Sequence, residues 1–268
     1  MLINERQSQI LDILSDRQAA SVAELAELLN VSGVTIRSDL NQLADQGRLV
    51  RTHGGAMLVG EKTRQELTFT TRQQLNAVQK QRIGELAATL VQPVDSILLD
   101  ASTTALAVGQ ALKHRQDLTD VTIVTTGVWT ALEMLGASHL NIILAGGNLR
   151  NTTGSITGSI ARDVLSKINI PKAFLGAWGL TVAQGLTEGN LQEVELKQFI
   201  IERCQEVIAV VDGSKFGQVA LSTFAPLEKI SRIVTDDCAP TEMVADFRAQ
   251  GIEVLIAESS TFREVRCR

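Results

Sequence analysis

The stretch that decides the fold covers residues 21–58, SVAELAELLNVSGVTIRSDLNQLADQGRLVRTHGGAML. Ser21 and Glu24 form a capping box, in which each side chain bonds to the other residue's backbone amide, and this pair predicts the start of a helix. One face of that helix is apolar and comprises Val22, Leu25, Leu28 and Leu29. Residues 31–33 then predict a turn, with Ser32 as the N-cap of a second helix.

The second helix has an apolar face and a polar face. At about 100° per residue, Ile36, Leu40 and Leu43 fall on one side. A helix that enters a major groove needs hydroxyl, amide and guanidinium groups in its first turns, because those turns meet base edges. The alternative is a solvated helix face in a protein-interaction module. The face concerned carries Val34, Thr35, Arg37, Ser38, Asn41 and Asp45.

A short hairpin follows the second helix. Residues 48–51 and 56–58 are strand-like and flank Thr52-His53-Gly54-Gly55, which predicts a two-stranded wing. The tip of this wing offers Arg51 and His53 to a phosphate backbone or a minor groove. Helix, turn, helix and wing together predict a winged helix-turn-helix DNA-binding domain.

Residues 1–58 form this predicted domain, in which a first helix over about 4–16 turns Ile10, Ile13 and Leu14 inward. The domain holds five arginines, seven acidic residues and no lysine, so it lacks the overall basic charge typical of nucleic-acid-binding domains. We therefore expect modest electrostatic affinity per subunit, and binding to double-stranded DNA as a homodimer or homotetramer. The arginines on the second helix and the wing are Arg37, Arg48 and Arg51.

The whole chain has the composition of a globular protein. Of its 268 residues, 44% are hydrophobic and 21% are charged, and the net charge is −5. No apolar run approaches the roughly 18 residues of a membrane helix, and a signal-peptide core is missing, so we expect a cytoplasmic protein. Cys204, Cys238 and Cys267 form no C-x-x-C motif, and the three histidines are scattered. We expect no disulfide framework, no metal site and no cofactor.

The remainder of the chain alternates between strand-like and helical segments. This alternation predicts a parallel sheet with both faces covered, in an α/β domain over residues 76–268 that follows a polar linker over 59–75. Short apolar segments occur at 96–99, 121–125, 141–145, 173–176, 207–211, 232–235 and 253–257. Helical spacing occurs at 76–91, 104–113, 127–135 and 193–204.

Polar residues follow the first predicted strand, at Asp100-Ala101-Ser102-Thr103-Thr104. Ligands of open parallel sheets bind beyond the carboxyl ends of the strands. Hydroxyls beside the amides of a helix N-terminus form a cradle for a phosphate. The alternative is that Ser102 or Thr103 only caps the helix that follows.

Two later strand ends carry further candidates. Gly146-Gly147 either lets the backbone approach a ligand closely or forms a plain turn. Arg150 can pair with an anion. Trp178 either stacks on or encloses a ligand, or it belongs to the core or to an interface.

Charged residues near the later strand ends complete the candidate set. Lys215, within Asp212-Gly213-Ser214-Lys215-Phe216-Gly217, is a possible phosphate ligand or a counter-ion to Asp212. Glu193 and Lys197 are four residues apart on a predicted helix, where the simplest interpretation is a surface salt bridge. Several such groups at strand ends together predict a pocket for an anionic metabolite.

The DNA-binding half resembles the DeoR family of bacterial sugar-metabolism regulators. The matching residues are V-S-G-V-T-I-R-S-D-L at 31–40 and G-R-L-V-R-T-H-G-G-A at 47–56. Members of the family typically show a V-S-x-x-T-I-R-x-D-L recognition helix and an R-x-H-G-G-A wing. Our hypothesis is that one set of side chains contacts bases, namely Val34, Thr35, Arg37, Ser38 and Asn41. A second set contacts backbone phosphates and so positions the domain on DNA, namely Ser32, Arg51 and His53.

The resemblance extends over the second half of the chain. It implies a sensor domain similar to the sugar-phosphate isomerase and CoA-transferase fold. The matching motifs are D-A-S-T-T (100–104), A-G-G (145–147), F-L-G-A (174–177), Glu193 with Lys197, and D-G-S-K-F-G (212–217). The resemblance implies an effector site formed by Asp100, Ser102, Thr103, Thr104, Gly147, Glu193, Lys197 and Lys215, to which the strand-end pattern adds Arg150.

Three positions depart from the family pattern. Ser102 stands where the family usually has Gly, Gly127 where Asn is common, and Trp178 where a small or acidic residue is frequent. The serine narrows the predicted cradle and the tryptophan adds bulk. The effector is therefore expected to differ from the common sugar phosphates or to bind in a different pose.

The resemblance implies a transcriptional repressor of a carbohydrate-metabolism operon that binds operator DNA and is released or modulated by a phosphorylated sugar or a related metabolite. An activator is the variant that the sequence leaves open. The alternative from another class is a sugar-phosphate isomerase-like enzyme, in which Asp100, Glu193 and Lys215 supply acid, base and electrostatic stabilisation. We expect no enzyme activity, because sensing needs only binding residues.

Overall fold

The computed structural model describes residues 3–17, 19–45, 48–52, 54–58 and 67–259. The chain divides into two compact units, and the boundary lies between Ala77 and Val78. Each unit is described by itself.

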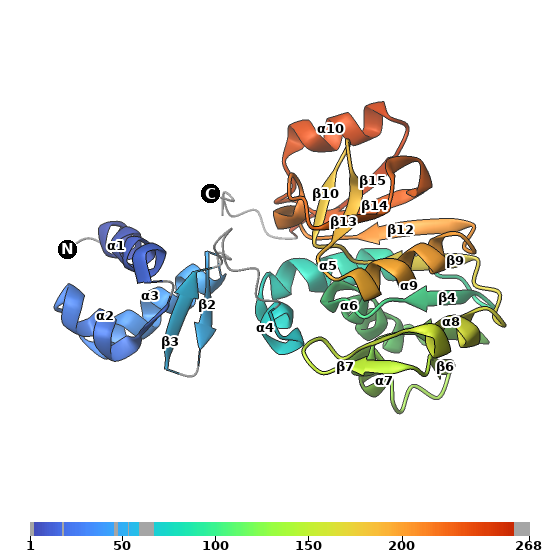
Figure 1. The fold of residues 1–268 in the computed structure, drawn as a ribbon, viewed down its shortest axis with the longest axis horizontal. Helices are drawn as coiled ribbons and strands as arrows, with labels where there is room; N and C mark the ends of the chain where they lie inside the picture. Colours follow the sequence, from blue (N-terminus) through green and yellow to red (C-terminus); the bar gives the residue numbers. More distant parts are fainter. Residues whose placement is uncertain (1–2, 18, 46–47, 53, 59–66, 260–268) are drawn as a thin grey trace. The chain divides into compact units, whose positions relative to one another are not determined.

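The first unit packs three helices against a small sheet (Figure 1). The winged helix-turn-helix prediction is confirmed. The buried side chains of the core include Ile10, Leu14, Leu25, Ile36 and Leu40, each inaccessible to solvent. The elements are α1 (Ile3–Arg17), β1 (Ala19–Ser21), α2 (Val22–Leu29), α3 (Gly33–Asp45), β2 (Leu49–Thr52) and β3 (Gly55–Leu58).

The small sheet has one strand more than predicted. Strand β1 pairs antiparallel with β3, so the order is β1-β3-β2 and the two-stranded wing is a three-stranded sheet. With only three residues, β1 is too short for alternation of apolar and polar residues to reveal it. It leads directly into the capping box of α2.

Both predicted helix caps are present. The Ser21 hydroxyl accepts from the Glu24 amide at 3.2 Å, and the Glu24 carboxylate accepts from the Ser21 amide at 2.7 Å. The Ser32 hydroxyl accepts from the Thr35 amide at 3.1 Å, so α3 begins at Gly33. Satisfying these first-turn amides fixes where both helices start.

A helix also occurs within the segment expected to form a linker. Helix α4 (Phe69–Gln74) is capped by Thr68, whose hydroxyl accepts from the Thr71 amide at 3.3 Å. Its six residues make fewer than two turns, which is too short for the apolar spacing of a helix to be recognised.

The second unit is built on a seven-stranded parallel sheet with strand order β15-β14-β12-β9-β4-β5-β6 (Figure 1). Each strand predicted from an apolar segment is present, with its ends within one residue of the prediction. The strands are β4 (Ser96–Leu99), β5 (Val121–Thr125), β6 (Leu140–Leu144), β9 (Lys172–Leu175), β12 (Glu206–Val210), β14 (Arg232–Asp236) and β15 (Glu253–Ala257).

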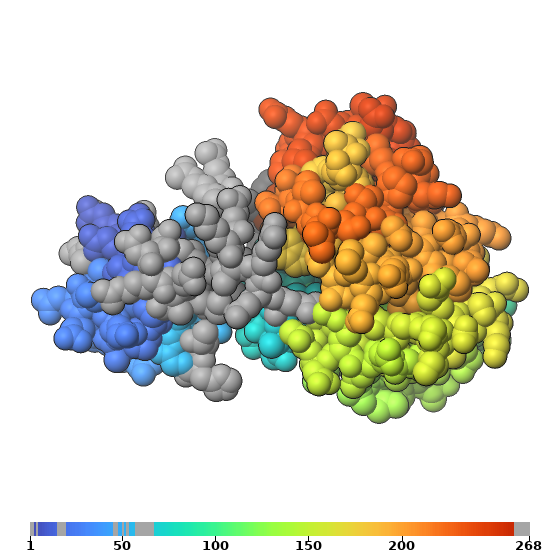
Figure 2. Space-filling model, viewed as in Figure 1, coloured from blue at the N-terminus to red at the C-terminus, as the bar shows by residue number. Residues whose placement is uncertain are grey.

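Both faces of this sheet are buried, as predicted. Neighbouring residues of β4 go to different hydrophobic cores, with Leu98 in one and Ile97 and Leu99 in the other. The core with Leu98 contains side chains of α8 (Ser159–Leu165), α9 (Leu191–Ile201) and α10 (Thr241–Ala249). The core with Ile97 contains side chains of α5 (Ala77–Ala88) and α6 (Thr103–Lys113). The space-filling view shows residues of α8 and α9 covering the face of the unit turned to the reader (Figure 2).

Several shorter elements were not predicted. Helices α8 and α10 are missing from the predicted set, whereas α5, α6, α7 (Val128–Glu133) and α9 are in it. The strands involved have three or four residues each, which is too few for a clear pattern. They form a hairpin of β7 (Asn148–Arg150) with β8 (Ser155–Thr157), and a small antiparallel sheet of β10 (Gly179–Thr181), β11 (Gly185–Glu188) and β13 (Ser222–Ala225).

The order of the strands reverses between β4 and β9. From β4 the chain adds β5 and β6 on one side, whereas β9 is followed by β12, β14 and β15 on the other. At such a switch point the connections leave in opposite directions, and the crevice beyond the carboxyl ends of the two strands is where open α/β sheets bind ligands. Asp100 follows β4 and Gly176 follows β9, so both lie at this switch point.

Candidate functional site

The polar face of α3 is exposed in the first unit. Its apolar face is inaccessible to solvent at Ile36, Leu40 and Leu43, so packing fixes which side faces outward. Val34 is 73% exposed, which suits contact with a thymine methyl group better than a role in the core. Of the other predicted contacts, Ser32, Arg37, Ser38 and Asn41 are exposed and Thr35 is half-buried.

The wing is joined to α3 through Arg51. One guanidinium nitrogen of Arg51, Nη1, donates to the Asn41 side-chain oxygen at 3.1 Å and to the Arg37 carbonyl at 3.2 Å. Two predicted DNA contacts are thus in contact with each other, so the orientation of the Asn41 amide depends on the wing. His53, predicted to act from the tip of the wing, lies outside the described residues.

A buried ion pair holds α3 to α1. Arg6 and Asp39 form two parallel hydrogen bonds, of 2.5 Å from Nε to Oδ2 and 3.1 Å from Nη2 to Oδ1. Asp39 follows the exposed Ser38 but points inward, and its side chain is 4% exposed. Its negative charge is therefore neutralised within the unit instead of facing DNA. The sequence pattern gave no sign of this pair, because the two residues are 33 positions apart.

In the second unit, Asp100 connects the two strands of the switch point. Its Oδ2 accepts from the Gly176 amide at 3.0 Å, and its Oδ1 accepts from the Ser102 amide at 3.0 Å. The side chain is almost completely buried. Asp100 therefore shapes the two strand-end loops by holding their backbone amides.

The N-terminus of α6 lies in the same loop. The Ser102 hydroxyl accepts from the Ala105 amide at 3.1 Å and caps the helix, so the capping role considered for Ser102 is present. The Ser102 amide is taken by Asp100. The cap does not use the amides of Thr103 and Thr104. These amides lie in the first turn of α6, where no intrahelical carbonyl is available to accept from them. Such amides, at the positive end of a helix, suit an anion.

Lys197 lies at the centre of a buried charge network. Its ammonium donates to a Glu188 carboxylate oxygen at 2.9 Å and to the Gly176 carbonyl at 2.9 Å, and it lies 3.3 Å from Asp100. Burial lowers the pKa of Lys197, but the carboxylates of Glu188, Asp100 and Glu193 raise it by more, so the net pKa lies above the ordinary lysine value. The lysine is therefore charged at neutral pH.

Glu193 has partners of its own. Its Oε1 pairs with Arg150 of β7 and accepts from the Ser155 hydroxyl of β8 at 2.8 Å. The predicted surface salt bridge between Glu193 and Lys197 is wrong, because both side chains are largely buried and each pairs with a different group. Arg150, considered as an anion ligand, instead joins the β7–β8 hairpin to the first turn of α9.

Gly147 has a structural requirement for glycine. Its φ is +150°, and a Cβ there would lie 2.6 Å from the Thr157 carbonyl oxygen. The absence of a side chain therefore lets the backbone approach β8. A ligand contact at Gly147 stays a prediction.

Lys215 lies at the end of the neighbouring strand, β12. It belongs to the short 3-10 helix Gly213–Lys215, whose cap is Asp212. The Asp212 carboxylate accepts from the Ser214 amide at 3.1 Å, so it shapes the loop that carries the lysine. The Lys215 ammonium lies 5.8 Å from the centroid of the Trp178 ring.

Two residues of this network were missed by sequence reasoning. Glu188 ends the short strand β11 and belongs to no motif, whereas Gly176 lies in the F-L-G-A motif but acts only through its backbone. Around the switch point the structure brings together Asp100, Ser102, Lys197, Glu188 and Gly176. Thr103 and Thr104 start α6, which follows β4, and Arg150 and Glu193 pair with each other. Gly147 follows β6, two strands away from β4, and Lys215 lies beyond β12, the neighbour of β9.

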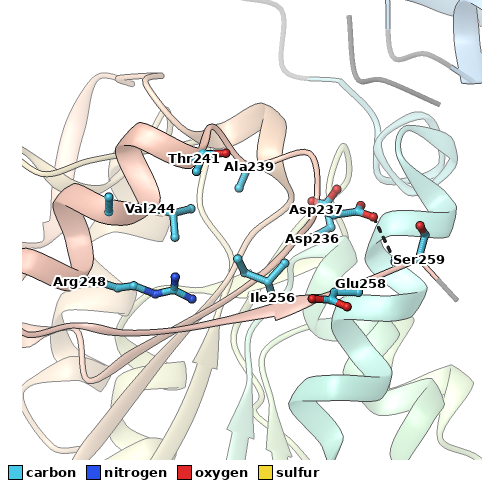
Figure 3. A pocket seen from close by; sticks show the side chains of 10 residues that line it. Asp236, Asp237, Ala239, Thr241, Val244, Arg248, Ile256, Glu258 and Ser259 are labelled. Carbon is cyan, nitrogen blue, oxygen red and sulfur yellow. Dashed lines mark hydrogen bonds between the residues drawn. The ribbon is translucent and has the colours of Figure 1, made fainter. Parts of the chain in front are cut away.

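A separate hollow of about 710 Å³ lies at the ends of β14 and β15 (Figure 3). Two of its charged residues, Arg248 and Asp237, already form contacts within the chain. Arg248 donates to the Val254 carbonyl at 2.8 Å, and Asp237 pairs with Arg82 and accepts from the Ser259 amide. The hollow is lined by Asp236, Asp237, Ala239, Thr241, Val244, Ala245, Arg248, Ile256, Glu258 and Ser259.

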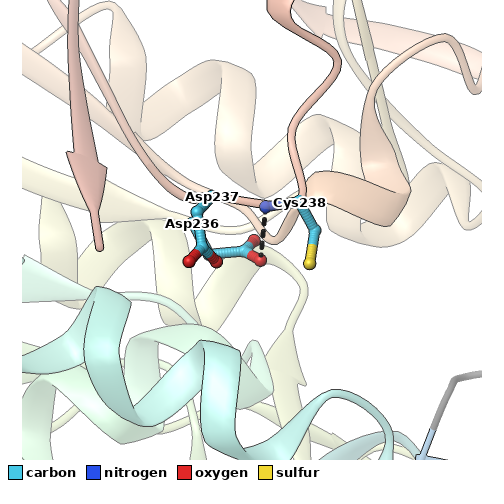
Figure 4. Close-up of side chains that lie close together, drawn as sticks. All are labelled: Asp236, Asp237 and Cys238. Carbon is cyan, nitrogen blue, oxygen red and sulfur yellow. Dashed lines mark hydrogen bonds between the residues drawn. The ribbon is translucent and has the colours of Figure 1, made fainter. Parts of the chain in front are cut away.

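Asp236, Asp237 and Cys238 lie close together beside this hollow (Figure 4), but Cys238 is disulfide-bonded, so its sulfur is not a free metal ligand. The Asp236 carboxylate accepts from the Gly213 amide at 2.7 Å and from the Cys238 amide at 3.2 Å. Burial, supported by the nearby Asp212, raises the pKa of Asp236 against the effect of these amides. These hydrogen bonds give the cluster a structural role in holding two loops.

Both halves of the chain match known protein families. The DeoR-like helix-turn-helix domain matches residues 6–62, and the DeoR C-terminal sensor domain matches residues 75–237. The chain therefore belongs to the DeoR family of transcriptional regulators. Within the described ranges, none of the helices has the length and apolar character needed to cross a membrane.

Individual relatives match over nearly the whole chain. The HTH-type transcriptional regulator GolR of Listeria innocua is 33% identical over 95% of this chain and 98% of its own length. The putative aga operon transcriptional repressor of Escherichia coli O157:H7 is 30% identical over 94% and 93% of the two chains. Among solved structures, ribose 5-phosphate isomerase A from Methanocaldococcus jannaschii is similar at a TM-score of 0.40, with 19% identity over 53% of this chain and 55% of its own.

Proposed function

We propose that this DeoR-family regulator is a repressor of carbohydrate-metabolism genes and that a phosphorylated sugar releases it from its operator. The observation that supports the sensing half is the switch point between β4 and β9, where Asp100 and Lys197 hold Gly176 and the amides of Thr103 and Thr104 begin α6. Fixed amides beside buried, ordered charges are suited to a small anion. The repressor assignment is supported by the name of the aga operon relative.

Operator contact is assigned to the exposed face of α3. Arg37, Ser38 and Asn41 carry donors and acceptors that fit base edges, and Val34 offers an apolar contact. Ser32 and Arg51, together with His53 from the sequence prediction, are assigned to phosphates, which fix orientation without reading sequence. Because the unit has few basic residues, binding as a homodimer or homotetramer supplies the remaining affinity.

The effector is assigned to the strand-end crevice. The amides of Thr103 and Thr104 and the ammonium of Lys215 bind the phosphate, while Asp100, Lys197 and Glu188 act as positioning residues that keep the loops in shape. Ser102 narrows the crevice through its side chain, which lies 2.4 Å from the point that a Gly176 Cβ would occupy. Arg150, Glu193 and Gly147 shape the hairpin beside it.

Release requires that the effector bind one state of the protein more tightly than the operator-bound state. A coupling of about 1–3 kcal/mol, or roughly 5–150-fold in operator affinity, is typical of such regulators. An effector with equal affinity for both states would release nothing.

The test begins with the operator. Purified full-length protein is mixed with sheared genomic DNA of the source organism, and the bound fragments are sequenced. One or a few fragments upstream of carbohydrate genes are expected, each with a repeated half-site. Recovery of DNA without sequence preference would contradict the operator assignment.

The enzyme alternative has its own test. An isomerase acting on a bound sugar phosphate exchanges the proton at C2, which is visible by NMR in deuterated water. We expect no exchange for any sugar phosphate that stabilises the protein. Exchange that disappears in Lys215→Ala would replace the sensor assignment with a catalytic one.

A further inference from the structure

Trp178 is an exposed aromatic residue at the carboxyl edge of the parallel sheet. It lies two residues beyond Gly176, whose amide is held by Asp100 and whose carbonyl is held by Lys197. The side chain is 43% exposed. A tryptophan serving only as core would be covered, because its large apolar surface favours burial.

The position of the Trp178 backbone is tightly held. Its amide donates to the Thr187 carbonyl of β11 at 2.9 Å. The next residue, Gly179, packs so closely that a Cβ there would lie 2.1 Å from the Gln218 carbonyl oxygen. The indole therefore projects from a fixed point, which lowers the entropy cost of using it as a binding surface.

A cation accompanies the ring. The Lys215 ammonium lies 5.8 Å from the Trp178 ring centroid, within the range of a cation–π contact. Lys215 follows β12, which is the neighbour of β9 in the sheet, so the two side chains come from adjacent strand ends. The sheet edge thus presents a flat apolar surface next to a positive charge.

We propose that the effector binds in its ring form, with the C–H face of a cyclic sugar against the Trp178 indole and its phosphate at Lys215. A pyranose ring has a flat face of C–H groups that can be buried on an indole, while its hydroxyls stay at the edge in water. An open-chain polyol phosphate has the same charge but no such face. The inference rests on the proposed function, since it names the ligand class of that same site.

Trp178 thus gives this chain an exposed apolar surface at the sheet edge, beside the Lys215 ammonium. Trp178 is therefore a specificity-determining residue, and Lys215 is the cation it orients.

The test compares two matched ligands on the full-length protein. The probes are aldohexose 6-phosphates, which are mainly cyclic, and the corresponding hexitol 6-phosphates, which cannot close a ring. Calorimetric titration of the unmodified protein is expected to show at least one hexose phosphate bound about tenfold more tightly than its hexitol, which corresponds to about 1.4 kcal/mol. In Trp178→Ala this ratio falls to about one, with the hexitol affinity changed by less than about twofold.

Fluorescence supplies a second readout. The chain has two tryptophans and no tyrosine, so Trp129→Phe leaves Trp178 as the sole tryptophan emitter. A cyclic phosphate is expected to shift the emission of Trp129→Phe and to leave that of Trp178→Phe, which reports only Trp129, unchanged. If Trp178→Ala fails to fold, Trp178→Phe keeps an aromatic face and should retain the preference for rings.

The outcomes separate the two proposals. Equal affinity for hexose and hexitol phosphates overturns the ring-form inference but leaves the proposed anion site intact. A nucleoside monophosphate that binds more tightly than either sugar phosphate has the same consequence. Equal weakening of both sugars by Trp178→Ala also overturns it. A protein that binds none of these phosphates, inorganic phosphate included, overturns the proposed effector site and the inference with it.

Discussion

The Lys197 ammonium lies 2.9 Å from a carboxylate oxygen of Glu188, in the buried interior of the α/β unit. The two residues come from α9 and β11, and the same ammonium holds the end of β9 through the Gly176 carbonyl. One lysine thus joins a helix, a short strand and the switch-point loop. Its position makes it a structural support of the proposed effector site.

Removing the Lys197 charge is expected to destabilise the protein. In Lys197→Met the carboxylates of Glu188 and Asp100 remain buried without their cation, at a cost of about 3–5 kcal/mol. The measurement is urea unfolding of the variant and the unmodified protein. A loss below about 1 kcal/mol would show that water or a neighbouring group replaces the ammonium.

The same pair predicts a pH dependence. The folded pKa of Lys197 is raised above its unfolded value, so the stability contribution is complete below about pH 10.4 and is lost only as pH rises through the folded pKa. The difference in unfolding free energy between Lys197→Met and the unmodified protein should therefore be constant from about pH 7 to 9. A difference that falls over this range would mean that the lysine titrates there.

Arg37→Ala is expected to weaken operator binding strongly and leave folding intact. Arg37 is exposed on α3, so its loss would remove the proposed base contact, worth about 1–3 kcal/mol, and leave the core untouched. Fluorescence anisotropy with the selected operator measures the first effect and thermal unfolding the second. Arg48 is also exposed, so Arg48→Ala serves as a control for the loss of a positive charge alone. Unchanged operator affinity in Arg37→Ala would remove this residue from the contact surface.

Arg51 and Asn41 are expected to act together. Because Arg51 orients the Asn41 amide through a 3.1 Å hydrogen bond, removing either should impair the same contact. In a double-mutant cycle with Asn41→Ala and Arg51→Ala, the double variant should lose less affinity than the sum of the single losses, by about 0.5–3 kcal/mol. Strict additivity would mean that each side chain meets DNA independently.

Cys204 is expected to be a poor nucleophile. Burial raises the pKa of its thiol to about 11, so the thiolate is scarce at neutral pH. Alkylation with iodoacetamide, read on the peptide that contains Cys204, should remain slow at pH 8 and accelerate towards about pH 11. Denatured protein provides the control, since the same peptide then reacts rapidly. Rapid reaction of the folded protein at pH 8 would place this thiol in a more open setting.

Lys215→Ala is expected to blunt the response to effector without abolishing DNA binding. Lys215 belongs to the second unit, at the end of β12, so its removal leaves α3 and the wing unchanged. The expected result is unaltered operator affinity and a rise in the effector concentration needed for release. Lys229→Ala, in the other 3-10 helix of the unit, is a matched control. Release at the same effector concentration would show that Lys215 lies outside the site.

Local signals in the sequence were sufficient to predict the main helices and the strands of the parallel sheet. Ser21 and Glu24 marked a helix start because a capping box satisfies two amides within four residues. The strands of the parallel sheet, such as Ser96–Leu99, were recognisable because they are buried on both faces and therefore almost entirely apolar.

The remaining features depend on contacts between distant segments. Glu188 pairs with Lys197 only because β11 folds back under α9, and no spacing in the sequence reports that. The Arg6–Asp39 pair joins residues 33 positions apart. Glu193 was paired with Lys197 from helical spacing alone, whereas the hairpin β7–β8 supplies it with Arg150. Local patterns predict which residues are near a site, and tertiary contacts determine which partners they take.

The most direct test of the account is release of the selected operator by a phosphorylated sugar. Full-length protein is bound to labelled operator and titrated with sugar phosphates and their unphosphorylated parents, with operator affinity measured by anisotropy. We predict that one phosphorylated sugar lowers operator affinity by roughly 5–150-fold while its unphosphorylated parent has no effect. A sugar phosphate that raises the unfolding temperature of the protein but leaves operator affinity unchanged would contradict the claim that the crevice between β4 and β9 controls DNA binding.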